Sequence, residues 1–302
     1  MTTPSSLPGA RPAPTTISTR LRSLWRPKTM GTLFSYFLLA IFTFTTIFPF
    51  LWMLATTFKS RGAIFSLPPT LYPDLLFQEG MWDAYREVLT RHNFLRYSLN
   101  SLFVAGMAAI GQLITGSLAG FAFARMKFRG SSLLFGLLLA TTMIPVEVSI
   151  IPEFLLMAEL GWLDTFLPLI VPSFLVGSLG TFMLREFFGT IPEELVEAAV
   201  LDGASAFRIY KDIFLPISIP ALTTLFLIAF IHNWNELLRP VLYISSPELR
   251  TVTIGLTTFQ SEYGAQWNLL LAGAVISVIP LLVIYIAAQR YVVEGIATTG
   301  LK

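Results

Sequence analysis

The 302-residue chain contains no cysteine and only two histidines, His92 and His232. Disulfide frameworks and thiolate chemistry are therefore excluded, and zinc sites built from Cys and His are not expected. The sequence also lacks a G-x-x-x-x-G-K-[ST] phosphate loop. Without that backbone cradle and its lysine, the chain is not expected to hydrolyse ATP. No nucleophile, histidine and acid are arranged for covalent catalysis, so a non-catalytic protein is predicted.

Charged residues are scarce as well. Asp, Glu, Lys and Arg make up 13% of the chain, against roughly 25% in a typical soluble domain. Hydrophobic residues make up 54%. This composition indicates a membrane protein in contact with the lipid bilayer, and no nucleic-acid partner is expected.

The hydrophobic residues gather in six long stretches with few or no charges. Each has about the 20 residues that a helix needs to cross the hydrocarbon layer, and none shows the alternation over ten residues of a barrel strand. Backbone groups in lipid must be satisfied within the segment, which favours helices. The predicted fold is an all-α integral membrane protein with six transmembrane helices, at about residues 33–58, 98–124, 133–151, 166–184, 217–238 and 268–288.

Basic residues concentrate in alternate connecting segments, which predicts the orientation of the spans. With both termini in the cytoplasm, the inner segments hold about 13 basic and 7 acidic residues and the outer segments about 7 and 11. We therefore expect an N-in, C-in topology. The expected organisation is a disordered cytoplasmic tail (1–30), a transmembrane domain (31–288) with a cytoplasmic loop (185–216), and a cytoplasmic C-terminal tail (289–302).

The first outer loop contains the sequence MWDAYREVL at 81–89. Its residues Trp82, Tyr85, Val88 and Leu89 recur at helical spacing, which predicts a short helix at the membrane surface. The aromatic rings suit anchoring at the lipid interface. The alternative is contact with a partner protein.

The third span is interrupted by Pro145 and Pro152 on either side of Glu147. Proline removes a backbone donor and kinks a helix. An acid inside an apolar span is costly unless it faces a cavity or a partner. Glu147 is therefore either a pathway residue or, if the helix ends near Pro145, an acid at the wet outer surface.

Other polar residues within or at the ends of spans either line a solute pathway or bond across helices. His232 and its neighbours form the polar outer end of span five, with solute contact as the alternative, because Trp is a good stacking surface for a sugar face. The pathway candidates are Asn100, Gln112, Thr142, Glu147, Asn233, Trp234, Asn235 and Glu236.

Residues 191–220 form a charged island between two hydrophobic stretches. Thr190 and Glu193 have the spacing of a capping box, so a helix is expected to begin there and to end at Gly203. Ser205 is expected to cap a second short helix that ends before Pro216. On physical grounds alone, the island is either an amphipathic surface linker or a docking element for a soluble partner.

Within this island, Glu197-Ala198-Ala199, Asp202-Gly203-Ala204 and Leu215-Pro216 resemble the EAA loop of bacterial ATP-binding-cassette importer permeases. The resemblance extends over about residues 32–302. It is carried by FAFARMKFRG (121–130), the MIP and IIP sequences (143–152), LGWLDT (160–165), WNELLRPVLY (234–243) and QRYVVEGIATTGLK (289–302). These look like the sugar-type permeases related to the smaller membrane subunit of the maltose transporter.

The resemblance implies the six-helix fold of a type I importer permease in the bacterial cytoplasmic (inner) membrane. It implies a second permease subunit that forms a heterodimer with this one, a cytoplasmic ATPase dimer that holds ATP and Mg, and an extracytoplasmic solute-binding protein. This chain itself would bind no cofactor. The residues implied in ATPase coupling are Glu197, Ala198, Ala199, Asp202, Gly203, Ala204, Leu215 and Pro216, and those implied in a contact of the C-terminal tail are Glu294, Gly295 and Lys302.

The expected solute is an uncharged carbohydrate, because no obvious cluster of buried Arg or Lys marks an anion site. A glycerol-phosphate-type solute is the near alternative, since relatives carry that too. An ion-coupled secondary transporter with Glu147 as its ion site is a second alternative, although only one interrupted span is visible where such folds often show a pair. A membrane-embedded enzyme is a third and remote alternative.

Overall fold

The computed structural model describes residues 27–68, 70, 72–261 and 264–299, and side chains from Met30 to Tyr291 apart from residues 61, 69, 71 and 261–265. The chain divides into two compact units, residues 1–53 and 54–302. In the first unit, the described residues belong to helix α2 (Pro27–Thr57), which runs on into the second. Most of the predicted N-terminal tail lies outside the described residues.

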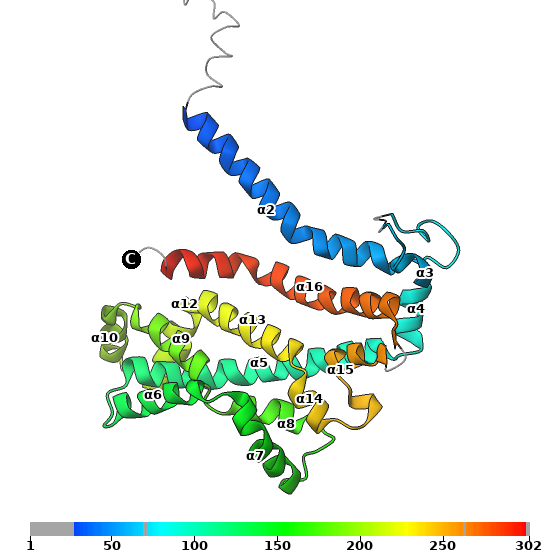
Figure 1. The fold of residues 1–302 in the computed structure, drawn as a ribbon. Coiled ribbons are helices and arrows are strands. Elements are labelled where there is room, and N and C mark those ends of the chain that lie inside the picture. Colours follow the sequence, from blue (N-terminus) through cyan, green and yellow to red (C-terminus); the bar gives the residue numbers. More distant parts are fainter. Residues whose placement is uncertain (1–26, 69, 71, 262–263, 300–302) are drawn as a thin grey trace, which may run out of the picture. The chain divides into compact units, whose positions relative to one another are not determined.

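The second unit is almost entirely helical, as Figure 1 shows. One antiparallel pair of two-residue strands departs from the all-α prediction, with Gln260 opposite Ala265. The elements after α2 are α3 (Arg61–Ile64), α4 (Asp83–Thr90), α5 (Phe94–Arg125), α6 (Ser131–Ala140), η1 (Thr141–Met143), α7 (Val146–Glu159), α8 (Leu167–Ile170), η2 (Val171–Phe174), α9 (Ser178–Gly189), α10 (Glu193–Leu201), α11 (Ala206–Ile209), η3 (Tyr210–Phe214), α12 (Leu215–Ile217), α13 (Ile219–Asn235), α14 (Leu238–Tyr243), η4 (Pro247–Leu249), α15 (Val252–Thr257), β1 (Gln260–Ser261), β2 (Gly264–Ala265) and α16 (Trp267–Thr299).

Between four and six of the described helical segments can cross a membrane by length and composition. Four do so as single segments, and two more do so as bent pairs, each joined across a short break. The single segments are Met30–Thr57, Phe94–Arg125, Leu167–Gly189 and Trp267–Tyr291; the bent pairs are Ser131–Met143 with Val146–Glu159 (98°) and Ala206–Ile217 with Ile219–Asn235 (79°).

The predicted interruption of the third span is present at Ile144 and Pro145, where the backbone is extended. The reason is local, because proline lacks an N–H and pushes the preceding residue out of the helical region. After the break, α7 continues past the predicted end at residue 151, through Pro152, to Glu159. The fourth predicted span is also divided, since Leu175 and Gly177 are extended between η2 and α9.

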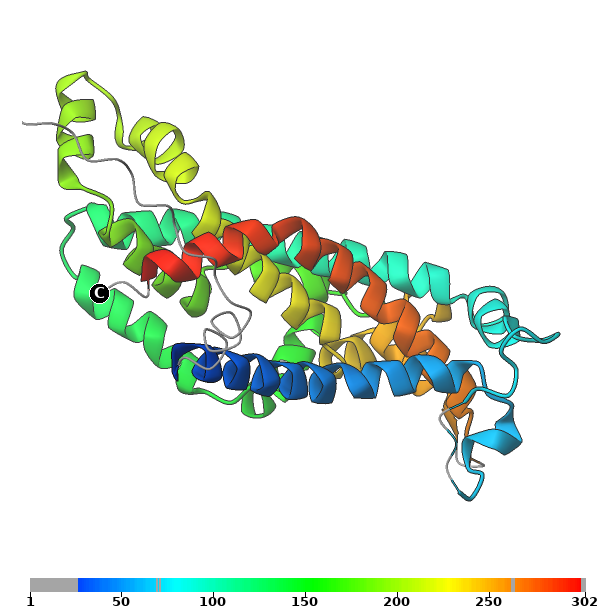
Figure 2. The same ribbon diagram turned by 90° about the horizontal axis from the view of Figure 1, so that it is seen from above.

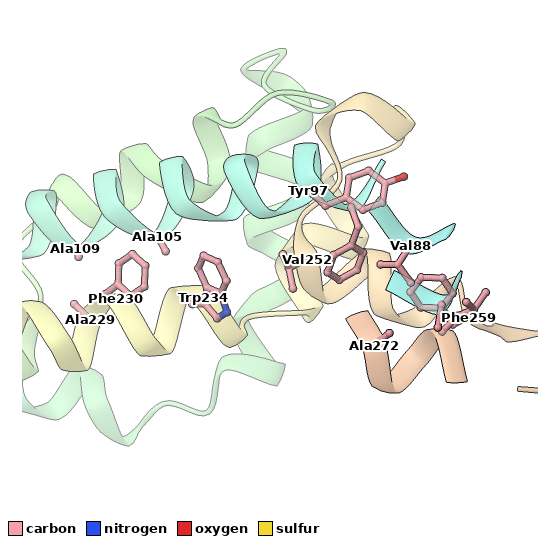
Figure 3. Close-up of a cluster of buried hydrophobic side chains, with 13 residues drawn as sticks. Val88, Tyr97, Ala105, Ala109, Ala229, Phe230, Trp234, Val252, Phe259 and Ala272 are labelled. Carbon is pink, nitrogen blue, oxygen red and sulfur yellow. The ribbon is translucent and has the colours of Figure 1, made fainter. Parts of the chain in front are cut away.

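The core of the second unit forms where α5, α13 and α16 lie side by side (Figures 1 and 2). Phe230 and Trp234 of α13 stack on each other, with ring centroids 5.6 Å apart, next to the small residues Ala105 and Ala109 of α5 (Figure 3). Trp234 is only 2% exposed. The short helix α4 predicted from MWDAYREVL is confirmed, and its Val88 is fully buried in the same core.

Helices α5 and α9 approach each other closely through glycine. Gly116 and Gly120 lie four residues apart on one face of α5, in the small-xxx-small pattern of membrane helix pairs. A Cβ added at Gly116 would lie 3.2 Å from the carbonyl carbon of Gly180, and one at Gly120 would lie 3.0 Å from the backbone nitrogen of Arg185. The neighbouring atoms are mostly backbone, so the two helices have little freedom to accommodate a side chain.

Two loops are joined by Asp164, which follows α7. Its carboxylate accepts hydrogen bonds from the backbone N–H of Ser245 (2.9 Å), the N–H of Ser246 (2.8 Å) and the hydroxyl of Ser246 (2.5 Å). Its own N–H donates to the carbonyl of Tyr243 at 2.7 Å. The Ser246 hydroxyl and the two backbone donors hold the pKa of Asp164 below its ordinary value. This carboxylate therefore ties the loop after α7 to the loop after α14.

The α5–α9 contact generates the first prediction. We expect Gly120→Ala to destabilise the protein by about 1–3 kcal/mol, because the added methyl group meets backbone that cannot move aside. Gly106→Ala on the same helix is the matched control, since a Cβ there meets nothing within 4 Å. The measurement is thermal unfolding of the purified protein in detergent, and equal melting temperatures for the two variants would contradict the close contact.

The second prediction concerns pH. The lowered pKa of Asp164 means that its contribution to stability is complete above the pKa of an unfolded Asp, about 3.9, and is lost as pH falls through the lower folded value. We expect Asp164→Asn to unfold at a lower temperature than wild type at pH 7, with the difference shrinking at pH about 3. Asp83→Asn is the control, because Asp83 is exposed and 3.9 Å from Arg86. A difference independent of pH would refute the assignment.

Candidate functional site: the segment between α9 and α13

The segment from α10 to α12 lies at the end of the second unit where α5 ends, opposite the end that carries α4 and α15 (Figure 1). Figure 2 shows α10 and α11, in yellow-green, projecting from the long helices. The segment has two faces. Ala199, Ala204 and Leu215 are half-buried and pack against a core of α5, α9 and α13, whereas Glu197 and Asp202 are exposed.

The exposed face combines carboxylates with large apolar side chains. Ala198, Gly203 and Pro216 are exposed beside Glu197 and Asp202. Sequence reasoning missed the apolar residues of this face: Val200 (57% exposed), Leu201 (88%) and Phe207 (66%). The sequence contains one sign of this surface, because these large apolar residues interrupt a charged segment. An apolar surface rimmed by charge is typical of a site that binds another protein.

The capping box predicted for Thr190 and Glu193 is wrong. The hydroxyl of Thr190 donates to the carbonyl of Phe187 at 2.7 Å, and the residue before the first turn of α10 is Pro192, whose side chain makes no cap. The cause is the short connection, because Thr190 is the residue that ends α9 and is used there. Glu193 and Glu194 still occupy the first turn, where negative charge is favourable.

The turn predicted at Gly203 is confirmed. Gly203 has φ +74° and its N–H donates to the carbonyl of Val200 at 3.0 Å, which closes the end of α10. Glycine adopts this left-handed conformation without the penalty that a Cβ brings. The cap predicted at Ser205 is confirmed as well, since its hydroxyl accepts from the N–H of Arg208 at 3.3 Å.

The second helix does not end before Pro216, as the sequence had suggested. It continues as a π-helical turn, η3, and then through Pro216 as α12. Pro216 lies in the first turn of α12, where its missing N–H is tolerated. The chain bends by 79° between Ile217 and Ile219. The end of the segment, α12, is therefore joined to α13 by a sharp bend at Ser218.

Several predicted pathway residues have structural roles in this conformation. The amide of Asn100 donates to the carbonyls of Glu248 (2.8 Å) and Arg250 (2.9 Å), which holds the loop before α15 against α5. The amides of Asn233 and Asn235 donate to the carbonyls one turn earlier in α13. These three side chains are engaged by backbone.

Trp234 and Glu236 also have partners within the protein. The ring of Trp234 is buried against Phe230, so it offers no face to a solute in this conformation. The carboxylate of Glu236 accepts from the N–H of Leu238 (3.0 Å) and that of Arg239 (3.4 Å), at the start of α14.

The remaining candidates lie apart from one another along the chain. Glu147 is exposed in the first turn of α7, just after the bend, and Thr142 is exposed with its hydroxyl donating to the carbonyl of Leu139 at 2.6 Å. Gln112 is half-buried on α5. For the predicted tail contact, Glu294 and Gly295 belong to α16, the side chain of Glu294 lies outside the described residues, and so does the whole of Lys302.

An ion-pair cluster that joins the middle of α7 to α14 was missed by sequence reasoning. The guanidinium of Arg239 forms two hydrogen bonds with the carboxylate of Glu153, at 2.9 and 3.1 Å, and lies 3.7 Å from Glu236. All three side chains are less than 30% exposed. The spacing of Glu236 and Arg239 predicts an i,i+3 ion pair. Glu153 is 86 positions from Arg239 in the sequence, and only folding brings the two together.

The described part of the chain contains no group of three or more His, Cys, Asp or Glu that could hold a metal ion. The segment between α9 and α13 presents an exposed surface of carboxylates and apolar side chains, and its other face packs on a buried cluster. Such a surface suits the docking of another protein rather than a chemical reaction.

The chain is similar to curated transporter permeases over most of its length. Curated relatives include a "Putative ABC transporter permease protein ORF2" of Caldicellulosiruptor sp. (strain Rt8B.4), 35% identical over 269 residues, covering 88% of this chain and 96% of the relative. The "sn-glycerol-3-phosphate transport system permease protein UgpE" of Salmonella typhimurium is 35% identical over 270 residues, covering 88% and 95%. The "Probable ABC transporter permease protein YurM" of Bacillus subtilis is 31% identical, covering 87% and 86%.

Among solved structures, a bacterial ABC transporter "involved in the import of the acidic polysaccharide alginate" contains a chain with a TM-score of 0.73 to this one. The match covers 93% of this chain and all of that chain at 21% identity, and it shows a shared fold. The family described as "Binding-protein-dependent transport system inner membrane component" matches residues 112–298, which include α9 to α13 and most of α16. This chain is therefore a member of the binding-protein-dependent transport system inner membrane components, a multi-pass permease subunit of an ABC importer in the inner membrane.

Proposed function

We propose that the segment from α10 to α12 is the site at which a cytoplasmic ATPase dimer docks on this permease and moves it. The observation that carries the proposal is the two-faced character of the segment. Ala199, Ala204 and Leu215 pack against the buried cluster that joins the segment to α5, α9 and α13, and the opposite face presents Glu197, Asp202 and exposed apolar residues. A docking element needs both properties, because a force applied to a loosely held loop would not reach the spans.

The chemistry of docking follows from the exposed face. The carboxylates of Glu197 and Asp202 can accept charge-assisted hydrogen bonds from basic or backbone donors on the ATPase. Leu201, 88% exposed, can fill an apolar groove, and apolar residues at the centre of an interface supply much of its stability. ATP and Mg would be bound by the ATPase subunits, and this chain would perform no catalysis itself.

The proposed topology has six spans with both termini in the cytoplasm. If each bent pair is counted as one span, the four single segments and the two bent pairs together give six spans. In support, the segment from α10 to α12 and the basic end of α5 lie at one end of the second unit, whereas the loops joined by Asp164 lie toward the other (Figure 1). The count over the whole sequence, about 13 basic and 7 acidic residues in the segments assigned to the inside, agrees with this orientation.

The proposed solute is an uncharged carbohydrate. Support comes from Arg239, whose charge is matched by Glu153 and Glu236, so that this cluster carries net negative charge and would not attract an anion. The relatives named for sn-glycerol-3-phosphate and the structure named for alginate keep a charged polar solute as the alternative. A solute-binding protein and a second permease subunit, in a heterodimer with this one, would complete the importer and largely set the solute.

The test uses two substitutions on the exposed face. We expect Glu197→Lys and Gly203→Asp to leave the chain in the membrane but to weaken ATPase copurification and uptake by roughly tenfold or more, because wrong charge or added bulk enters the docked surface. The measurements are copurification of the ATPase and ATP-dependent solute uptake in membrane vesicles.

Matched controls come from the outer end of the same chain. Gly161, like Gly203, has a left-handed backbone (φ +68° and +74°) with nothing within 4 Å of an added Cβ, so Gly161→Asp controls for backbone strain. Glu248→Lys controls for charge reversal. Unchanged copurification and uptake in both test variants would refute the docking assignment, whereas equal losses in the controls would assign the effect to folding.

A further inference from the structure

Arg125, the last residue of α5, contacts both ends of the segment from α10 to α12. Its Nη2 atom donates hydrogen bonds to the carbonyl of Phe188 (2.7 Å) and to the carbonyl of Ile191. The first carbonyl lies in the last turn of α9 and the second immediately before α10. The guanidinium also lies over the ring of Phe214, 5.4 Å from its centroid, where η3 leads into α12.

The contacts suit a guanidinium for physical reasons. The last carbonyls of a helix have no partner within it, and a cation is favourable at this end of the helix dipole. The planar guanidinium can donate in its own plane while its face lies over an aromatic ring. A lysine ammonium has the charge without this shape. Arg125 is therefore suited to hold two backbone groups and one ring at fixed positions.

The partners of Arg125 are themselves immobile. Phe188 and Phe214 are fully buried, and Ile191 is 5% exposed. The Phe121 ring, one turn before Arg125 on α5, packs against that of Phe214 with centroids 4.9 Å apart. One turn earlier again, the hydroxyl of Ser117 bonds with that of the buried Tyr210 at 2.7 Å. Three successive turns of α5 thus contact the end of the segment.

The first end is held by α5 as well. Phe188 belongs to α9, which is packed on α5 through Gly116 and Gly120. Arg125 extends this packing by one turn beyond α9, to the carbonyl of Ile191. Both ends of the segment are thus fastened to the same helix, although 26 positions separate Phe188 and Phe214 in the sequence.

We infer that Arg125 is a positioning residue that joins both ends of the segment to α5, so that the segment and α5 move as one body during transport. The inference rests on the proposed function, because it assumes that the ATPase moves this segment. The role belongs to the geometry of the guanidinium rather than to its charge alone. Without it, the segment can shift on its base and the movement reaches α5 incompletely.

The experiment uses the whole importer, reconstituted with its ATPase and binding protein. We expect Arg125→Met to lower solute transported per ATP hydrolysed by roughly tenfold, the size expected from losing hydrogen bonds to a charged group. Arg125→Lys should lie between wild type and Arg125→Met. Arg129→Met is the matched control, since Arg129 is an exposed residue of the same loop, and it should behave as wild type. A transport-to-hydrolysis ratio unchanged by Arg125→Met would overturn the inference.

A distance measurement covers the case in which Arg125→Met fails to assemble. The chain contains no cysteine, so Lys127→Cys and Glu194→Cys, both at exposed positions, give a clean pair of spin labels across the contact. In the otherwise unchanged complex we expect the same distance in the nucleotide-free and ATP-trapped states. In Arg125→Lys the distribution should broaden or differ between states. A distance that changes with nucleotide while Arg125 is present would overturn the inference.

The two hypotheses fail in different ways. If Glu197→Lys and Gly203→Asp leave uptake and ATPase binding unchanged, the proposed docking site is wrong. If those variants uncouple the importer while Arg125→Met keeps the wild-type ratio of transport to hydrolysis, the docking site stands and the role of Arg125 is refuted.

Discussion

The close approach of α5 to α9 at Gly116 and Gly120 is the contact on which the rest of the second unit depends. Backbone packed on backbone makes these two helices one rigid element, since neither can rotate without steric overlap. Helix α13 packs on the same pair, with Leu225 against Gly180. The segment from α10 to α12 leaves this element at the end of α9 and returns to it at the start of α13, so apolar packing alone already holds both of its ends near these helices.

Polar contacts then hold the connecting segments at each end of the helices. At the end near α10, Arg125 supplies donors to carbonyls of the chain between α9 and α10. Toward the other end, Asp164 and Asn100 bind backbone groups of the loops that follow α14. In each case one side chain binds two or more backbone groups of a connecting segment, which holds that segment against the helices.

Local sequence signals were reliable where the physics is local. The proline break at Pro145, the left-handed turn at Gly203 and the cap at Ser205 each depend on the chemistry of one residue and its immediate neighbours. The capping box at Thr190 was wrong because two helices compete for the same residue across a short connection. The helix through Pro216 was missed because a π-helical turn, which no simple spacing predicts, precedes it.

The sequence by itself determined the membrane class, the helical fold, the family and the position of the segment that we propose as the docking site, because hydrophobic length, proline, glycine and the EAA pattern act over a few adjacent residues. Only the tertiary structure decided which polar residues serve the fold. Asn100, Trp234 and Glu236 read equally well as pathway residues, yet each is engaged by the protein itself. Arg125 and Glu153 gained their roles in the same way, because their partners are distant in sequence and adjacent only after the helices pack.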